Sequence, residues 1–138
     1  MELKKYNFKD DGKIPNNKLP LLLYKGAFIE SGEEAANMLE ENFTSNNWKN
    51  SWRNGVYDFH HYHSNTHEVL GVYSGKALLH LGGEEGEKIE VVAGDIIVIP
   101  AGVGHKNLGS ENFKIVGAYP DGRDYNMNYG KEGERPSS

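Results

Sequence analysis

The stretch HHYHSNTHE at residues 60–68 is the most informative part of this sequence about its fold and its chemistry. His61 and His63 are two positions apart, so on an extended strand both side chains point to one face. Two imidazoles on one face at this spacing are typical of metal ligands. Glu68 would lie on the wrong face of an unbroken strand, so we predict a bend or bulge over residues 64–66 that brings it to the same side.

The fourth candidate ligand is His105, which follows the rigid turn Pro100–Gly104. This turn predicts a strand that returns alongside the first pair of histidines. An alternative stays open for His67, which replaces Glu68 as a ligand if the bend is longer than we assume. His67 and Tyr57 are the candidate catalytic residues, as a general acid or base beside the metal.

Two further histidines are expected to have structural roles. His60 lies on the opposite face of its strand from His61, which places it on the surface or between sheets. His80 stands apart from the other five histidines.

Downstream of residue 54 the chain consists of short runs of β-branched and aromatic residues between glycine-bearing turns. This pattern is typical of a meandering antiparallel barrel. It predicts an all-β jelly roll, with one or two strands from the N-terminal segment added. The predicted strands are Tyr57–His63, Glu68–Tyr73, Lys76–Leu81, Lys88–Val92, Asp95–Pro100, His105–Leu108 and Phe113–Tyr119.

The N-terminal part has a different texture. The apolar run Leu19–Tyr24 predicts a buried strand that begins at a sheet edge, because Pro20 cannot donate to a ladder. Ser31 and Glu34 form a capping-box pattern before an amphipathic helix. We divide the single domain into an N-terminal extension at 1–50, a barrel core at 51–125 and a polar tail at 126–138. Residues 130–138 of this tail are expected to be loosely ordered.

Residues 55–109 resemble the two motifs of the cupin family. The first cupin motif, G-x5-H-x-H-x4-E-x6-G, is met at every spacing up to Gly75. The second, G-x5-P-x-G-x2-H-x3-N, begins at Gly94 and departs only at Gly109, where the family has Asn. Asn107 is expected to supply the local hydrogen bonding of that missing Asn.

The resemblance implies a cupin barrel that holds one divalent transition metal through His61, His63, Glu68 and His105. Within the family, the stretch at 60–75 is similar to small stand-alone bacterial proteins of the YjlB-like type. Cupins support dioxygenases, isomerases and decarboxylases, and also proteins that only bind or sense small molecules. A polar network without metal, as in cupin sugar epimerases, is the alternative for the four residues, and a storage role is the weakest hypothesis.

The donor set suits Fe, Mn, Co, Ni, Cu or Zn, and the sequence does not distinguish among them. Three neutral imidazoles and one carboxylate leave a divalent metal about one positive charge in excess, so we predict a small anionic ligand. Arg53 and Arg123 are candidates to hold a second acidic group of that ligand.

Composition narrows the remaining possibilities. The chain has 138 residues, a net charge of −5 and no cysteine, which excludes thiolate ligands and disulfides. The Lys and Arg residues are scattered, so we expect no nucleic-acid partner. No run is long enough to span a bilayer and no signal peptide is evident, which predicts a cytoplasmic protein. The exposed edges of an open barrel predict a homodimer.

Overall fold

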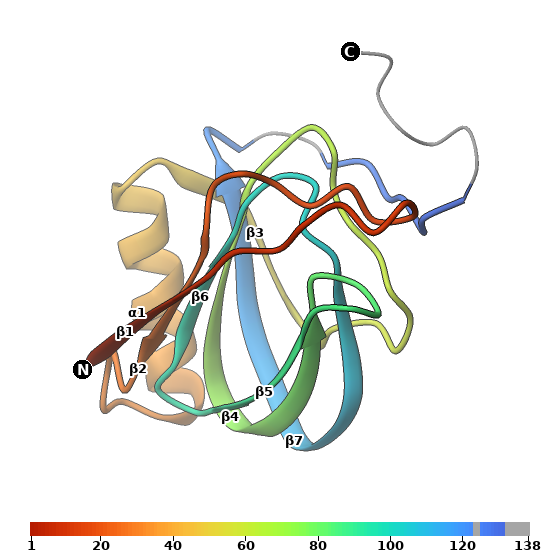
Figure 1. The fold of residues 1–138 in the computed structure, drawn as a ribbon. Helices are drawn as coiled ribbons and strands as arrows, with labels where there is room; N and C mark the ends of the chain where they lie inside the picture. The colour runs from red at the N-terminus through yellow and green to blue at the C-terminus, as the bar shows by residue number, and fades with distance from the viewer. Residues whose placement is uncertain (123–124, 132–138) are drawn as a thin grey trace.

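The computed structural model describes residues 1–122 and 125–131, in which seven strands and one helix are found (Figure 1). All strand pairs are antiparallel, which confirms the all-β prediction. The elements are β1 (Glu2–Tyr6), β2 (Leu21–Lys25), α1 (Gly32–Ser45), β3 (Trp48–Asn54), β4 (Glu68–Leu81), β5 (Glu87–Val92), β6 (Ile96–Ile99) and β7 (His105–Pro120).

Strand β4 organises the sheet. The strand order is β1-β2-β6-β4-β7-β3, and β5 also pairs with β4. The first half of β4 pairs with β6, its second half with β5, and β7 runs along both halves on the other side. In Figure 1 these long strands curve together, while α1 lies on the outside of the sheet.

Two predicted pairs of strands are each one continuous strand. The gap between the predicted strands Glu68–Tyr73 and Lys76–Leu81 is not a chain reversal. Gly75 in this gap has a φ of 68° and sits in an irregular part of the ladder between β4 and β7. A side chain at Gly75 would collide with the backbone of Glu111 on β7. The glycine therefore lets two strands pass closely, and does not reverse the chain.

This irregularity changes which residues of β4 face the barrel interior. Before it, Leu70 and Val72 belong to the interior core, whereas after it Leu79 and Leu81 do so. The even-numbered positions face inward in the first half and the odd-numbered positions in the second. Glu68 consequently faces the interior, as Leu70 and Val72 do.

The helix forms where the sequence predicts it. Its stripe of Ala35, Leu39 and Phe43 is buried, and Leu39 lies against the outer face of β4 at Gly71. The capping box is wrong in detail, because Ser31 occupies the N-cap position but its side chain makes no capping hydrogen bond. No helix in the described residues combines the length and the apolar character needed to cross a membrane.

The apolar N-terminal strand is covered within the chain. Leu21 and Leu23 of β2 are buried, with β1 on one side of the strand and β6 on the other. Strand β1 therefore covers the outer side of β2 within the chain and itself becomes the edge strand. Four of the five residues of β1 are exposed. The homodimer stays a prediction.

Two other segments differ from expectation. Tyr57–His63, predicted as a strand, does not form one, and its β pairing consists of isolated bridges of His61 with His105 and of Tyr62 with Asn128. Strand β3 was not predicted, because most of its residues are polar and exposed. It pairs with β7 and carries Trp52 to the interior.

Candidate metal centre

The bridge between His61 and His105 places two candidate ligands side by side. The amide of His105 donates to the carbonyl of His61 over 2.9 Å, and the amide of His61 donates back over 3.2 Å. The two imidazole centroids are 3.9 Å apart. The turn before His105 returns the chain alongside the histidine pair, as predicted.

His63 joins the same cluster from the segment that follows. The carbonyl of His63 accepts a hydrogen bond of 2.7 Å from the amide of Gly102, which holds this segment against the turn. One ring nitrogen from each of His61, His63 and His105 lies within 4.8 Å of the others, and all three side chains are buried. The chain bends at residues 64 and 65 before β4 begins at Glu68.

Each imidazole is oriented in the same manner. Nδ1 lies against a backbone carbonyl in all three rings, at 3.1 Å from Phe59 for His61, 2.6 Å from Asn126 for His63 and 3.2 Å from Val103 for His105. A carbonyl oxygen only accepts, so each Nδ1 must carry the proton. Each Nε2 is then left with a lone pair when the ring is neutral, which is the arrangement usual for metal-ligating histidines.

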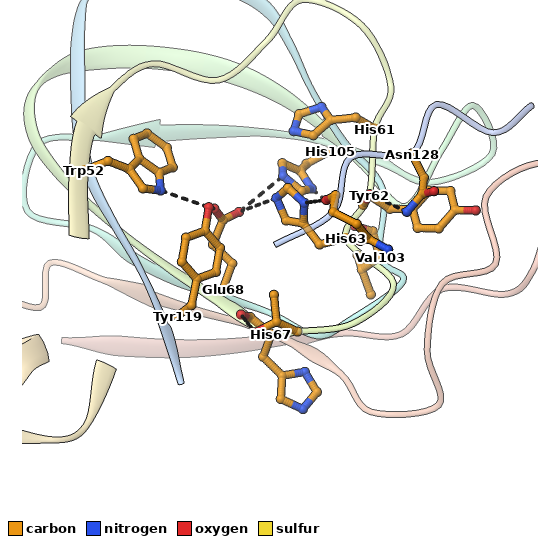
Figure 2. Close-up of polar contacts among 12 residues, drawn as sticks. Trp52, His61, Tyr62, His63, His67, Glu68, Val103, His105, Tyr119 and Asn128 are labelled. Carbon is orange, nitrogen blue, oxygen red and sulfur yellow. Dashed lines mark hydrogen bonds and ion pairs between the residues drawn. The ribbon is translucent and has the colours of Figure 1, made fainter. Parts of the chain in front are cut away.

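Glu68 completes the cluster (Figure 2). Its Oε1 lies 3.4 Å from Nε2 of His105 and 3.6 Å from Nε2 of His63. Its Oε2 accepts a hydrogen bond of 2.7 Å from the Tyr119 hydroxyl, which in turn accepts one of 2.9 Å from Nε1 of Trp52. One carboxylate oxygen is thus directed at the histidines and the other is held by the protein.

The charges of the cluster are coupled. Burial, followed by the neighbouring His105, lowers the pKa of His61 to about 3. Burial also acts to lower the pKa of His63, but the hydrogen bond and charge of Glu68 outweigh it and the net shift is upward. The pKa of Glu68 is lowered, because contacts with His105 and His63 outweigh the opposing effect of burial. Both shifts favour the charged forms of His63 and Glu68, whose Nε2 and Oε1 atoms lie 3.6 Å apart.

A cavity of about 150 Å³ opens beside the cluster. All four candidate ligands line it. Aromatic and apolar side chains make up much of the rest of its wall, including Trp52, Val56, Leu70, Tyr119, Tyr125 and Met127.

Tyr57 and His67, the two predicted catalytic residues, are placed differently. Tyr57 lines the cavity, is half exposed, and packs edge-on against the ring of His61 with centroids 5.4 Å apart. His67 points away from the cluster (Figure 2), and its Nδ1 accepts a hydrogen bond of 2.8 Å from the amide of Ala101. Glu68, and not His67, is the residue that the fold brings to the histidines.

Three contributors to the site were not singled out by the sequence. Trp52 comes from β3, while Tyr125 and Asn126 come from the C-terminal segment. The ring of Tyr125 stacks on that of Tyr119 at 4.9 Å, and its centroid lies 5.0 Å from that of His63. Asn126 and Met127, which belong to the predicted polar tail, also contribute to the site, although nothing in the spacing of the tail indicated this.

Arg53 lines the cavity but is already engaged. Its guanidinium pairs with Glu33 at 2.7 Å and with Glu40 at 2.6 Å, both on α1. These hydrogen bonds raise the pKa of Arg53 above its ordinary value. The arginine fastens the helix to β3, and both of its terminal nitrogens are engaged by side chains of that helix. Arg123, the other candidate, lies outside the described residues.

Comparisons with known proteins agree with this geometry. The model of the Cupin domain matches residues 54–118. The chain is 46% identical over 136 residues to the protein YjlB of Bacillus subtilis (strain 168), a match that covers 97% of this chain and 79% of that protein. The chain belongs to the cupin family. Within it, this cupin falls in the YjlB-like group, as the motifs predicted.

Several solved structures are also similar to this cupin. A variant of oxalate decarboxylase from Bacillus subtilis has a TM-score of 0.47 and 22% identity, and covers 80% of this chain and 27% of its own. A DUF861 family protein from Thermotoga maritima has a TM-score of 0.40 and 22% identity, with 62% of this chain and 92% of its own covered. Likeness of this degree carries no information about a reaction.

Proposed function

We propose that this cupin is a metal-dependent enzyme that acts on a small, singly charged organic anion. The metal would be held by Nε2 of His61, His63 and His105 and by Oε1 of Glu68. The observation that carries the proposal is the shared orientation of the three rings. Each Nδ1 is bound to a backbone carbonyl, and the Nε2 atoms of His63 and His105 face one buried carboxylate oxygen.

The donor set fits a divalent transition metal. Three imidazoles and a carboxylate are borderline donors that suit Fe, Mn, Co, Ni, Cu or Zn better than Ca. Burying these polar groups costs desolvation free energy, and a cation bound by the three Nε2 atoms and Oε1 of Glu68 would offset part of that cost. When bound, such a metal supplies Lewis acidity to a ligand in the cavity.

The surrounding residues have separate tasks in this proposal. Tyr119 donates to Oε2 of Glu68, which leaves Oε1 for the metal. Burial, followed by the charge of Glu68, raises the pKa of Tyr119, so its hydroxyl keeps its proton and acts as a donor and not as a base. Tyr57, half exposed beside His61, would contact the substrate as it enters the cavity.

The charge and size of the cavity define the substrate class. The metal with its four ligands would carry about one excess positive charge, which favours an anion in a site shielded from water. Apart from the histidines, Arg53 is the only cationic residue along the cavity wall in the described chain, and it is paired with two carboxylates. The metal would therefore pair with one acidic group of the substrate, and no unpaired cationic side chain of the described cavity wall would pair with a second.

The volume points the same way. About 150 Å³ is well below the roughly 300–1,000 Å³ of pockets that hold drug-sized ligands. A short hydroxy or keto monocarboxylate matches this space, and its two oxygens offer the metal a bidentate donor.

Calorimetric titration of the metal-loaded protein tests this substrate class. Lactate and its neutral amide form a matched pair, with citrate, 2-oxoglutarate and a neutral hexose as comparisons. We expect lactate to bind at least about tenfold more tightly than lactamide, a difference of about 1.4 kcal/mol, with no gain for citrate. Tighter binding of the hexose or of lactamide would contradict the proposal.

A non-catalytic cupin that binds or senses the same anion is the second candidate. It is favoured by the placement of His67 outside the cluster and by the commitment of the Tyr119 proton to Glu68. Both leave the cavity poor in a free general base. Incubation of the metal-loaded protein with a ligand that binds distinguishes the two, because only an enzyme converts the ligand, and Tyr57→Phe should then slow the conversion.

A further inference from the structure

A second group of metal-binding side chains lies outside the barrel cavity. His60, His80 and Glu84 each offer a ligand atom, and these atoms lie within 4.8 Å of one another. None of the three lines the cavity that holds the first cluster. The second cluster therefore cannot be part of the candidate metal centre.

The fold explains why these residues meet on the outer wall. Leu79 and Leu81 face the interior core, so His80 between them points outward from β4. His60 precedes His61 in the chain, and its ring packs against that of His80 and not against the first cluster. Glu84 comes from the turn between β4 and β5.

The contacts within the second cluster are close. Nε2 of His60 donates to Oε1 of Glu84 over 2.8 Å, and the rings of His60 and His80 have centroids 4.7 Å apart. His80 is buried and the side chain of His60 is 14% exposed, while that of Glu84 is 73% exposed. Two imidazoles are therefore held in place by packing, and one carboxylate is free to adjust.

His60 also has an unsatisfied atom. Its Nδ1 is buried and has no hydrogen-bond partner among the described residues. Because Nε2 carries the proton donated to Glu84, Nδ1 of the neutral ring has an unused lone pair. A buried polar atom without a partner marks a place where an ion or a water is expected.

We propose that His60, His80 and Glu84 form a second binding site for a divalent transition metal, with zinc as the best match. Two imidazoles and a carboxylate with one position left for water are a ligand set typical of zinc. Tetrahedral zinc at 2.0–2.2 Å from its ligands places the donor atoms about 3.4 Å apart. Rotation of the exposed Glu84 side chain provides most of the adjustment that this geometry requires.

Neighbouring charges make this site weaker than the first. His80 lies opposite Lys88 on β5 and Lys106 on β7 in the strand register. Both lysines oppose a bound cation, and one carboxylate does not cancel them. Burial, followed by the nearby His60, lowers the pKa of His80, which keeps that ring neutral and available as a ligand at neutral pH.

Zinc at this site would fasten the segment that carries His61 to β4 and to the turn after it. Metal that binds only the folded state stabilises it in proportion to the logarithm of metal concentration over the dissociation constant. The second site would thus stabilise the loop from which the first site takes two of its ligands.

Zinc titration of four proteins tests the proposal, with zinc itself as the probe. The wild type should bind two equivalents per chain. A variant with His63→Ala and His105→Ala should retain one equivalent, which is the second site alone. Adding Glu84→Gln to that variant should weaken the remaining site at least about tenfold, and adding Glu85→Gln, on the same turn, should change nothing.

The outcomes separate the two sites. Two results would overturn the second site. The first is loss of all zinc binding in the variant with His63→Ala and His105→Ala. The second is zinc binding in that variant with an affinity that does not change when Glu84→Gln is added. A wild type that binds one equivalent and loses it only with Glu84→Gln supports the second site while contradicting the first. Should the double variant not fold, the ring signals of His60 and His80 in NMR spectra of the wild type replace it. These must shift on addition of the second zinc equivalent, and unchanged ring signals would equally overturn the site.

Discussion

The hydroxyl of Tyr119 lies 2.7 Å from Oε2 of Glu68, while Oε1 of the same carboxylate faces His105 and His63. The two oxygens are thus assigned to different partners before any ligand arrives. Trp52 extends the arrangement by donating to the same hydroxyl over 2.9 Å. Residues from β3, β4 and β7 therefore fix the orientation of the only carboxylate in the first cluster.

Tyr119→Phe should weaken metal binding at the first cluster by about 10- to 100-fold, the usual effect of removing a hydrogen bond behind a metal ligand. The phenylalanine ring preserves the packing, so the change acts on the orientation of Glu68. Competition with a coloured chelator measures the affinity. Tyr125→Phe is the control, because it keeps the stacked rings of residues 119 and 125 and leaves the hydrogen bond from Tyr119 to Glu68 in place. Equal losses in both variants would contradict the role given to Tyr119.

Gly117→Ala should destabilise the protein by about 1–3 kcal/mol, because an added methyl group would overlap the Trp52 ring at 2.4 Å. Trp52 must then move, and its hydrogen bond to Tyr119 is lost. Chemical denaturation measures the free energy of unfolding. Gly109→Ala on the same strand is the control, since a Cβ there meets no atom within 4 Å. Unfolding midpoints that coincide for both variants would argue against this packing.

His67→Ala should leave metal content unchanged and cost about 1 kcal/mol of stability, because the Ala101 amide loses its acceptor. Glu68→Gln should have the opposite profile, with metal content strongly reduced. Metal analysis of both purified variants, together with thermal unfolding, makes the comparison. If His67→Ala lost as much metal as Glu68→Gln, the assignment of the carboxylate ligand would be reversed.

Metal-free protein should lose stability on acidification from pH 6.5 toward pH 4.5. The pKa of His61 falls from 6.5 to about 3 on folding, so the unfolded chain binds the extra proton in this window. One proton corresponds to a slope of about 1.4 kcal/mol per pH unit, with stability rising as pH rises. The raised pKa of His63 contributes stability that is fully present below 6.5 and is lost only above it.

Denaturation of the chelator-treated protein at several pH values measures this slope, and His61→Gln is the matched variant. The window stops at 4.5 because Glu68, whose pKa is lowered, adds a slope of the same sign below its ordinary value. The variant should have a flatter profile between the two limits. Parallel profiles for the two proteins would show that His61 is not buried in its neutral form.

The first cluster was largely predictable because its information is local. The spacing of His61 and His63 predicted that their rings meet, and they do so although their segment is not a strand. The bend at residues 64 and 65 precedes Glu68, as expected. The local hydrogen bonding expected of Asn107 is also found. Its side-chain oxygen accepts a hydrogen bond of 2.9 Å from the amide of Gly109, the position at which the second cupin motif has Asn. Such predictions succeed because they use only residue spacing and turn residues within a short stretch of sequence.

The parts that sequence reasoning missed depend on contacts between distant segments. Trp52 belongs to a polar strand with no apolar alternation, and Asn126 reaches His63 across 63 positions. Glycine in the sequence does not distinguish a turn from a bulge, because both use a positive φ. Gly75 has such a φ, but it lies at an irregularity within a continuous strand. That bulge also sets the outward direction of His80, so the second cluster cannot be derived from spacing.

The central claim is that one transition metal lies among His61, His63, Glu68 and His105. Anomalous scattering from crystals grown with zinc, recorded on both sides of the zinc absorption edge, locates the metal directly. We predict a peak among Nε2 of the three histidines and Oε1 of Glu68, at about 2.0–2.2 Å from each. A fully ordered site in those crystals without any anomalous peak among these four atoms would contradict the account.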